Sequence, residues 1–348
     1  MKVLENVPLS TLTTFKVGGF ARYLVHAENE EDIQTALALS RERGLPWYVL
    51  GGGSNILASD KGYEGVLIHP IFTDSVFHKD LEIKGKTVAI IGAGVVWDDF
   101  VREAATREFW GIENLAGIPG SVGAAPVQNI GAYGADISDT LLWLEALDAT
   151  TGILRRFTKE ECLFAYRESR FKHEPSYIIL RVAFSLTQDG VPHIDYEDLA
   201  RRAEQGERLD TPQAIGMVVR EIRAQKFPDL VLSGTAGSFF KNPILSNESY
   251  LQLVEQFPEL PGFPVAGAVH AAEKKGVKIP LAWVLDHVLN LRGYTKNQVK
   301  LFENQPLVLV AERGATAHEV DMFAREIELH VQEKISILIE REIRMLGF

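Results

Sequence analysis

A glycine-punctuated stretch, GIPGSVGAAPVQNIGAYG (117–134), is the feature of this 348-residue chain that most restricts its fold. It follows a predicted helix over 97–108, and a structureless loop of this length inside a domain is usually functional. Its glycines and alanines let a large flat ligand lie against the backbone, while Ser121, Gln128 and Asn129 offer hydrogen bonds to a heterocycle or a pyrophosphate. The alternative is a packed, irregular crossover without a ligand.

A second glycine cluster, Gly51, Gly52 and Gly53, directly follows a predicted strand. Glycine lets the backbone turn so that successive N–H groups point at a phosphate, although a tight turn explains the three glycines equally well. The Gly-Lys-Ser/Thr of a Walker A loop is missing, and IGAGVV (91–96) lacks the third glycine of a Rossmann fingerprint. The two glycine segments together suggest one extended dinucleotide.

The first elements predict a βαβ unit with parallel strands and a right-handed crossover. A strand over 21–27 precedes a helix that Asn29 caps and Gly44 ends, and a strand over 45–50 follows. Further along we expect strands that begin at Thr87 and lie over 142–149, 152–158, 177–186, 306–312 and 335–346, helices over 97–108, 211–227, 280–288 and 316–334, and a solvated loop over 270–276.

Composition excludes several classes of protein. The net charge of −11 provides no global positive field for nucleic acid or an anionic membrane, so a bound anion needs local cations. Cys162 is the only cysteine, which excludes an internal disulfide, a cysteine zinc site and an iron–sulfur cluster, and no metal site is expected. The N-terminal residues show no signal peptide, and no segment is apolar enough to span a membrane, so we expect a cytoplasmic protein.

Ser238, in GTAGSFFKNP (234–243), allows three interpretations. A hydrolase nucleophile elbow needs a second glycine after the serine, and Phe240 stands there. A turn serine is the ordinary explanation, and a hydroxyl that donates a proton needs companions. Candidate companions are Arg167 and Arg170 with Tyr166 in FAYRESRFKH, Tyr196 in IDYEDL, and Lys226 in RAQKFPD. Glu340, Glu342 and Arg344 lie on one face of the predicted closing strand, where a solvated edge strand explains the charges equally well.

These segments together resemble the UDP-N-acetylenolpyruvoylglucosamine reductase family, in its tyrosine-loop branch. The resemblance runs from about Thr14 to Arg344 through GGGSN, the 117–134 loop, FAYRESRFKH, RAQKFPD, GTAGSFFKNP and EREIR. It implies an α+β protein, with an FAD-binding fold of the vanillyl-alcohol-oxidase or p-cresol-methylhydroxylase type in two subdomains (1–69 and 70–227). A C-terminal α+β substrate-binding domain (228–348) follows, whose last residues can pack back on the first subdomain.

The resemblance also implies a reaction. NADPH reduces noncovalently bound FAD, and hydride passes from flavin N5 to C3 of the enolpyruvyl ether of UDP-N-acetylglucosamine, for peptidoglycan synthesis. Ser238 protonates C2, Arg167 stabilises the carboxylate of the substrate, and Glu342 orients or polarises the reacting atoms. The family's substrate-binding positions match Tyr166, Tyr196, Lys226, Asn242, Lys278 and Gln305, and the cofactor-binding positions match Gly51, Gly52, Gly53, Ser54, Asn55, Ile118, Pro119, Gly120, Ser121, Gly123, Asn129, Gly131 and Tyr133.

One position departs from the family pattern, because Phe263 stands where some relatives carry a tyrosine near the uridine. The run before Lys278 is also longer than in some members, which makes this the weakest of the substrate assignments. Two alternatives remain at this point: an FAD-dependent oxidase of a sugar or hydroxy acid with the same fold, and a noncatalytic nucleotide-binding protein. The partners implied are small molecules, and a monomer is plausible.

Overall fold

The chain divides into two compact units, each assembled from three separate stretches of sequence. The computed structural model describes residues 2–79, 85–265 and 276–348, so the expected loop at 270–276 lies outside the described residues except for Gly276. Unit 1 consists of Met1–Glu5, Arg22–Gly52 and Glu64–Ala224, and unit 2 of Asn6–Ala21, Gly53–Tyr63 and Gln225–Phe348. The predicted division at residues 69 and 227 stays a prediction.

The first sheet follows the sequence-based expectation only in part. The predicted strands form, but their order in the sheet is β1-β2-β5-β3, so β5 separates the two strands of the expected βαβ unit. β5 pairs with β3 in parallel, with Leu67 opposite Tyr48. The sequence analysis missed β5 although its centre, Val66 to Ile68, is a fully buried apolar run. The strands are β1 (Lys2–Pro8), β2 (Phe20–Ala27), β3 (Trp47–Val49) and β5 (Tyr63–Pro70).

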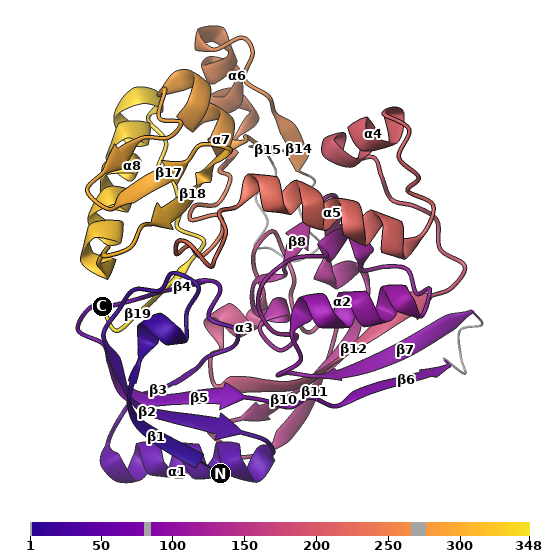
Figure 1. The fold of residues 1–348 in the computed structure, drawn as a ribbon, viewed down its shortest axis with the longest axis vertical. Helices are drawn as coiled ribbons and strands as arrows, with labels where there is room; N and C mark the ends of the chain where they lie inside the picture. Colours follow the sequence, from indigo (N-terminus) through magenta and orange to yellow (C-terminus); the bar gives the residue numbers. More distant parts are fainter. Residues whose placement is uncertain (1, 80–84, 266–275) are drawn as a thin grey trace. The chain divides into compact units, whose positions relative to one another are not determined.

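Helix α1 (Glu30–Arg43) lies along one face of this sheet (Figure 1). It begins where predicted, because the Asn29 side chain accepts a hydrogen bond from the N–H of Asp32 at 3.0 Å. It ends at Gly44, whose φ of 61° is the left-handed conformation that glycine adopts without strain. Ile33 and Leu37 bury their side chains against the sheet, which fixes the helix in place.

The second sheet of unit 1 has the order β11-β10-β12-β7-β6, with antiparallel neighbours throughout. Trp97 and Phe100 of α2 pack with Phe184 of β12, and Ile215 and Val219 of α5 complete the same core. The strands are β6 (Ser75–Lys79), β7 (Lys86–Gly92), β10 (Leu141–Asp148), β11 (Leu154–Thr158) and β12 (Tyr177–Thr187), and the helices are α2 (Trp97–Thr106), α3 (Arg170–His173), α4 (Glu197–Glu204) and α5 (Pro212–Lys226).

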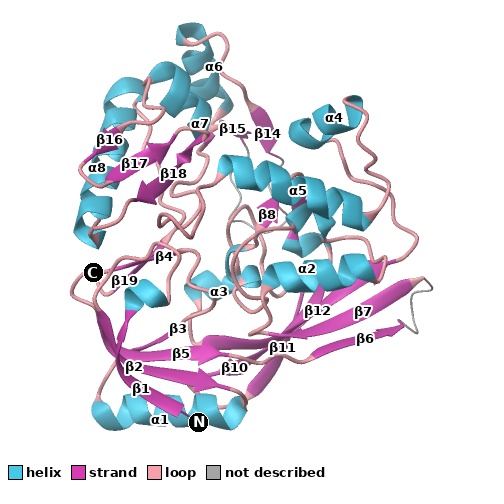
Figure 2. Cartoon of the chain, viewed as in Figure 1, coloured by secondary structure: helices cyan, strands magenta, loops and turns pink. Residues whose placement is uncertain are grey.

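Unit 2 is built around α8 (Ala317–Ile335), which packs on the sheet β16-β17-β18 (Figure 2). The predicted capping box at Thr316 and Glu319 is present. The carboxylate of Asp60 also accepts hydrogen bonds from the N–H groups of Ala317 and His318, both at 2.8 Å. The other elements are β4 (Ile56–Ala58), β13 (Ile244–Leu245), α6 (Asn247–Gln256), β14 (Phe263–Val265), β15 (Gly276–Lys278), α7 (Leu281–Trp283), which continues as a π-helix (Val284–Val288), β16 (Thr295–Lys296), β17 (Val299–Phe302), β18 (Gln305–Ala311) and β19 (Arg344–Leu346).

The predicted closing strand over 335–346 is wrong for most of its length. α8 continues to Ile335, and the left-handed Ser336 ends it at a φ of 57°. Only β19 (Arg344–Leu346) forms a strand, paired in parallel with β4. Between them, Arg341 forms only an isolated antiparallel bridge with Phe240, and its side chain pairs with Glu328 and Asp321 of α8.

Candidate functional site

The two glycine segments singled out in the sequence meet inside unit 1. A Cβ atom added at Gly51 would lie 3.0 Å from the hydroxyl oxygen of Ser121, and one added at Gly52 would lie 2.7 Å from the Cα of Gly120. Such a distance excludes a side chain at Gly52, so its backbone can lie directly against that of Gly120 because residue 52 is glycine. The contact places the peptide groups of two loops side by side, which is the arrangement that a phosphate-bearing ligand needs.

The loop over 117–134 is ordered by backbone hydrogen bonds and is not structureless. The N–H of Trp97 donates to the carbonyl of Gly120 at 3.0 Å, and the N–H of Gly123 donates to Ala93 at 2.9 Å. A 3₁₀ helix (Ala125–Gln128) and the short hairpin of β8 (Gly131–Ala132) and β9 (Ala135–Asp136) continue it. Ile118 and Val127 pack on the core of unit 1, which anchors the loop to the sheet.

A partly buried ionic cluster that the sequence analysis missed holds the start of this loop. Asp98, in the first turn of α2, accepts hydrogen bonds from the N–H of Gly117 at 2.6 Å and from Nε of Arg220 at 2.9 Å. Arg223, one turn further along α5, donates to the carbonyl of Gly117 at 3.0 Å. Burial lowers the pKa of Arg223. In the sequence these residues are ordinary helix charges, because only the packing of α2 against α5 brings them together.

Tyr166 and Arg167 form a tight turn beside the same loop. The backbone N–H and carbonyl groups of Ala165 and Glu168 are hydrogen-bonded to each other, and Arg167 has a φ of 53°. Its guanidinium donates to the carbonyl of Gly131 at 2.5 Å and lies 5.4 Å from the centre of the Tyr166 ring. The planar cation is therefore oriented by the backbone of the loop.

The Asn129 side chain, inside the loop over 117–134, is hydrogen-bonded to the turn that carries Arg167. It is 3% exposed, donates to the carbonyl of Ala165 at 3.1 Å and accepts from the N–H of Ser138 at 3.2 Å. Its amide group is thus used inside the chain to join the loop to the turn that carries Arg167. The expected hydrogen bonds from its side chain to a heterocycle stay a prediction.

Tyr133 and Tyr196 bring a predicted cofactor position and a predicted substrate position into contact. Their rings meet edge to face, with centroids 5.3 Å apart and an interplanar angle of 75°. Burial raises the pKa of Tyr133 to about 12 and also raises the pKa of Tyr196. Both phenols therefore keep their protons at neutral pH and can donate hydrogen bonds.

In unit 2, Ser238 lies on an extended segment between β18 and the C-terminal residues. Ser238 forms an antiparallel bridge with Val308, and the N–H of Phe239 donates to the carbonyl of Leu307 at 2.8 Å. On the other side, the N–H of Glu342 donates to the carbonyl of Phe239 at 2.8 Å. The structure therefore brings the predicted pair Ser238 and Glu342 onto adjacent backbone segments.

The residues around Ser238 fix this part of the chain. Gly237 has a φ of 75°, which favours glycine, and Phe239 is fully buried. Ser238 itself is partly exposed. Asn55, a predicted cofactor position, donates from its side chain to the carbonyl of Glu342 at 3.2 Å, and its own carbonyl accepts from the N–H of Arg344 at 2.9 Å.

The remaining predicted substrate positions of unit 2 lie around the same segment. Asn242 accepts at 2.9 Å from the N–H of Leu281, and Lys278 is paired through β15 with Ile244 and with Phe263. Gln305 begins β18, and Lys226 precedes Phe227, whose ring lies 4.0 Å from a Cβ added at Gly237. Ser54 follows Gly53, whose carbonyl accepts from the N–H of Thr14 at 3.1 Å.

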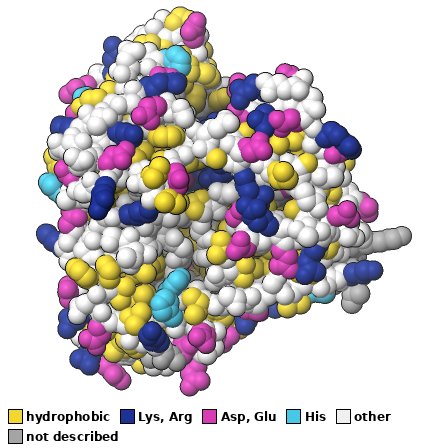
Figure 3. Space-filling view, in the orientation of Figure 1, with side chains coloured by type: hydrophobic (Ala, Val, Ile, Leu, Met, Phe, Trp, Pro, Cys, Tyr) yellow, Lys and Arg dark blue, Asp and Glu magenta, His cyan; other side chains and the backbone are white. Residues whose placement is uncertain are grey.

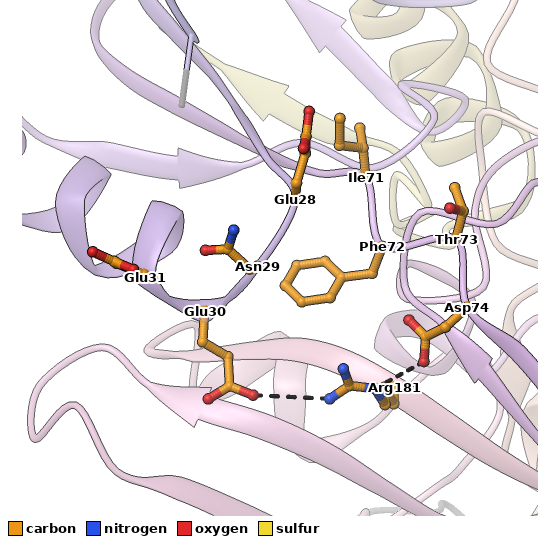
Figure 4. Close-up of a pocket in the computed structure, with 9 residues that line it drawn as sticks. All are labelled: Glu28, Asn29, Glu30, Glu31, Ile71, Phe72, Thr73, Asp74 and Arg181. Carbon is orange, nitrogen blue, oxygen red and sulfur yellow. Dashed lines mark hydrogen bonds and ion pairs between the residues drawn. The ribbon is translucent and has the colours of Figure 1, made fainter.

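A pocket of about 780 Å³ in unit 1 contains none of these residues (Figure 4). Arg181 pairs there with Asp74 at 2.9 Å and Glu30 at 3.8 Å, and Glu28 and Glu31 add further negative charge. An acidic lining repels a diphosphate, so this pocket is unsuited to a nucleotide. On the face drawn in Figure 3, acidic and basic side chains are interspersed, and no broad basic surface is present there.

The described residues contain no group of three or more His, Cys, Asp or Glu side chains arranged to hold a metal ion. None of the helices in this part of the chain is long and apolar enough to cross a membrane. Cys162 is buried, and burial raises its pKa to about 12, so its thiol stays protonated.

Comparisons with known proteins agree with this geometry. Residues 21–158 match a family model described as an FAD binding domain, and residues 229–346 match one described as the C-terminal domain of UDP-N-acetylenolpyruvoylglucosamine reductase. These matches confirm the expected fold, an FAD-binding part followed by a separate C-terminal domain of helices and strands.

Two relatives of that name resemble nearly the whole chain. The protein from Pseudomonas aeruginosa is 37% identical over 344 residues, which cover 98% of both chains. The protein from Bdellovibrio bacteriovorus is 36% identical over 347 residues, which cover 98% of this chain and 99% of the relative. The crystal structure of UDP-N-acetylenolpyruvylglucosamine reductase (MurB) from Thermus caldophilus matches all of both chains, with 25% identity and a TM-score of 0.67.

Proposed function

Because the chain belongs to the UDP-N-acetylenolpyruvoylglucosamine reductase family, we propose that it reduces the enolpyruvyl ether of UDP-N-acetylglucosamine with NADPH. The product is UDP-N-acetylmuramate, a precursor of peptidoglycan, and NADPH leaves as NADP⁺. Hydride adds to C3 of the carbon–carbon double bond, and a proton adds to C2. The observation that carries the proposal is the 37% identity to a reductase of this name over 98% of the chain. A nucleotide sugar and NADPH are both cytoplasmic metabolites, so the proposed reaction belongs in the cytoplasm.

The residues of the glycine segments fit an FAD. A Cβ at Gly51 or Gly52 would occupy space taken by Ser121, Ala124 or Gly120, so side chains are kept away from the peptide groups at this contact. Gly51, Gly52, Gly120 and Ser121 would hold the pyrophosphate through backbone N–H groups, and Gly123, whose N–H donates to Ala93, keeps side chains away from the loop. FAD, when bound, supplies the hydride chemistry that amino-acid side chains cannot perform.

Ser238 is the proposed proton donor to C2. A serine hydroxyl has a pKa far above neutrality, so it donates only to a strongly basic acceptor, and the carbanion that hydride addition creates at C2 is such an acceptor. Ser238 is partly exposed, and Gly237 before it has no side chain to block a substrate. Glu342, on the adjacent backbone segment, is the proposed group that orients or polarises the reacting atoms.

Cations and phenols complete the proposed substrate site. Arg167 stabilises the substrate carboxylate as negative charge spreads onto it, and hydrogen bonds to the loop backbone orient its guanidinium. Lys226 and Lys278 are proposed to face the diphosphate, and Tyr196, whose phenol is protonated at neutral pH, is proposed to donate a hydrogen bond. Tyr166, Asn242 and Gln305 are proposed to contact the rest of the substrate.

Stopped-flow absorbance under anaerobic conditions separates the two half-reactions. We expect NADPH to bleach the flavin band of the purified protein, and the UDP-N-acetylglucosamine enolpyruvyl ether to restore it. Ser238→Ala should leave the bleaching step within about twofold and slow the recovery roughly 10²- to 10⁴-fold, the usual contribution of a general acid. Flavin that is bleached but never recovers with wild-type protein would contradict the proposed substrate.

The matched control is Ser246→Ala, which removes the N-cap hydroxyl of α6 in the same unit. It should cost stability without slowing either half-reaction. Equal loss of both half-reactions in Ser238→Ala would show that the serine supports the fold or cofactor binding and is not the proton donor. A colourless wild-type protein that never binds flavin would favour a noncatalytic nucleotide-binding protein.

A further inference from the structure

The buried side chain of Asn114 joins the loop over 117–134 to the segment that carries Tyr196. Asn114 is 2% exposed and belongs to a 3₁₀ helix (Glu113–Leu115). Its single amide nitrogen donates to the carbonyl of Tyr133 and to the carbonyl of His193, both at 2.8 Å. The two N–H bonds of one amide group are thus shared between two segments of unit 1 that are sixty residues apart.

Two other contacts hold the same segments together. The His193 ring lies against Gly134, where an added Cβ would come within 3.2 Å of the ring. The Tyr196 ring meets the Tyr133 ring edge to face at 5.3 Å. Tyr196 stands directly before α4 (Glu197–Glu204), so the position of His193 fixes where the chain enters this helix and where the phenol lies.

An asparagine at position 114 would be unfavourable if its only role were packing. Its side-chain oxygen is buried and has no hydrogen-bond partner within the described residues. An unpaired buried acceptor destabilises a fold, and a leucine of similar shape would avoid it. What leucine cannot provide is a pair of donors on one nitrogen atom, and both donors are used here.

We propose that Asn114 is a positioning residue that holds Tyr196 for the diphosphate of the substrate by tying its segment to the predicted FAD-binding loop. This inference rests on the proposed function, in which Tyr196 donates a hydrogen bond to the substrate. Asn114 does not touch the substrate. Its loss should therefore weaken substrate binding and leave the chemical steps almost unchanged.

Asn114→Leu keeps the shape and removes both donors. In full-length protein with bound FAD, we expect amide hydrogen exchange over residues 191–196 to become at least about tenfold faster. The KM for the UDP-sugar enolpyruvyl ether should rise about tenfold, as expected when one hydrogen bond to a charged group is misplaced, while kcat stays within about threefold. Flavin bleaching by saturating NADPH should stay unchanged.

Asn29→Ala is the control for lost stability, because it removes the N-cap of α1 and no contact to the tyrosine segment. Its KM should equal that of the wild type. Asn114→Asp covers the case in which the leucine variant does not fold. A protonated aspartic acid donates one hydrogen bond and an ionised one donates none, so the KM of this variant should also rise.

A KM within twofold of the wild type in both Asn114 variants, or a rise equal to that of Asn29→Ala, overturns the proposal. So does unchanged hydrogen exchange over residues 191–196. If the wild-type protein does not consume the UDP-sugar at all, the proposed function fails first. The exchange rates then still show whether Asn114 holds the segment, and the claim that it acts on substrate binding falls with the function.

Discussion

Replacing Asp98 with alanine should destabilise unit 1 by about 3 kcal/mol. The carboxylate accepts from Nε of Arg220 at 2.9 Å and from the N–H of Gly117 at 2.6 Å, and the two charged side chains are 20% and 18% exposed. Removing one partner of a fully buried ion pair costs roughly 3–5 kcal/mol, because the other charge stays buried without compensation. The lower end applies here, since about a fifth of each side chain reaches solvent.

Thermal and urea unfolding of the purified protein measure this loss. For a domain of this size each kcal/mol corresponds to about 2–4 °C, so the melting temperature of unit 1 should fall by about 6–12 °C. Flavin release reports the same transition, because Gly117 begins the predicted FAD-binding loop. Asp98→Asn keeps an acceptor for Gly117 and loses the charge, and it should destabilise less than alanine.

A double-mutant cycle with Arg220→Ala isolates the pair. The double variant should be no less stable than Asp98→Ala alone, because no uncompensated charge is then buried. A loss below about 1 kcal/mol in Asp98→Ala, or strictly additive effects in the cycle, would refute the reasoning that this ion pair anchors the loop.

The pH dependence provides an independent check on Asp98. Burial alone would raise its pKa, but hydrogen bonds from Arg220 and Gly117 outweigh burial and lower the pKa below 3.8. A depressed carboxyl pKa stabilises the folded state above the unfolded value, and this stability is lost as the pH falls through the folded pKa. Wild-type protein should therefore lose stability below about pH 4 more steeply than Asp98→Asn.

Two further predictions concern a histidine and a glycine of unit 1. Burial, and then the neighbouring His26, lower the pKa of His69 below 6.5, so the unfolded chain binds more protons and the free energy of unfolding should fall as the pH drops below about 6.5. His69→Gln should flatten this part of the profile in urea titrations, and an unchanged slope would contradict the assignment. Gly52→Ala should weaken FAD binding at least about tenfold in fluorescence titrations, because its Cβ meets the Gly120 backbone at 2.7 Å. Gly152→Ala, where nothing lies within 4 Å of the new Cβ, should bind FAD normally, and equal affinities in the two variants would exclude the proposed loop contact.

Local signals in the sequence predicted helix ends well. Asn29, Gly44 and the capping box at Thr316 act within one turn of the chain, so the residues that decide the conformation are adjacent in the sequence. Strands were less predictable, because a strand needs a partner that can be far away. The apolar alternation after residue 335 predicts a strand, but within the described chain Arg344–Leu346 pairs with β4 and Arg341 forms only an isolated bridge with Phe240.

The same distinction holds for the candidate site. The glycine segments are visible in the sequence because glycine at these positions has a direct backbone consequence. Asp98, Arg220 and Asn114 could not be singled out, because each resembles an ordinary polar residue until the packing of unit 1 brings its partners to it. A buried polar side chain shows its role only when the groups it satisfies are known.

Unit 2 is assembled from early and late stretches of the chain, and this has a consequence for its folding during synthesis. The N-terminus of α8 is capped by Asp60, and β19 pairs with β4, so Asp60 and β4 each take a partner from the last part of the chain. Until residues 317–346 have been synthesised, Asp60 lacks the N–H groups that it caps and β4 lacks its strand partner. Unit 2 can therefore complete these contacts only late in translation.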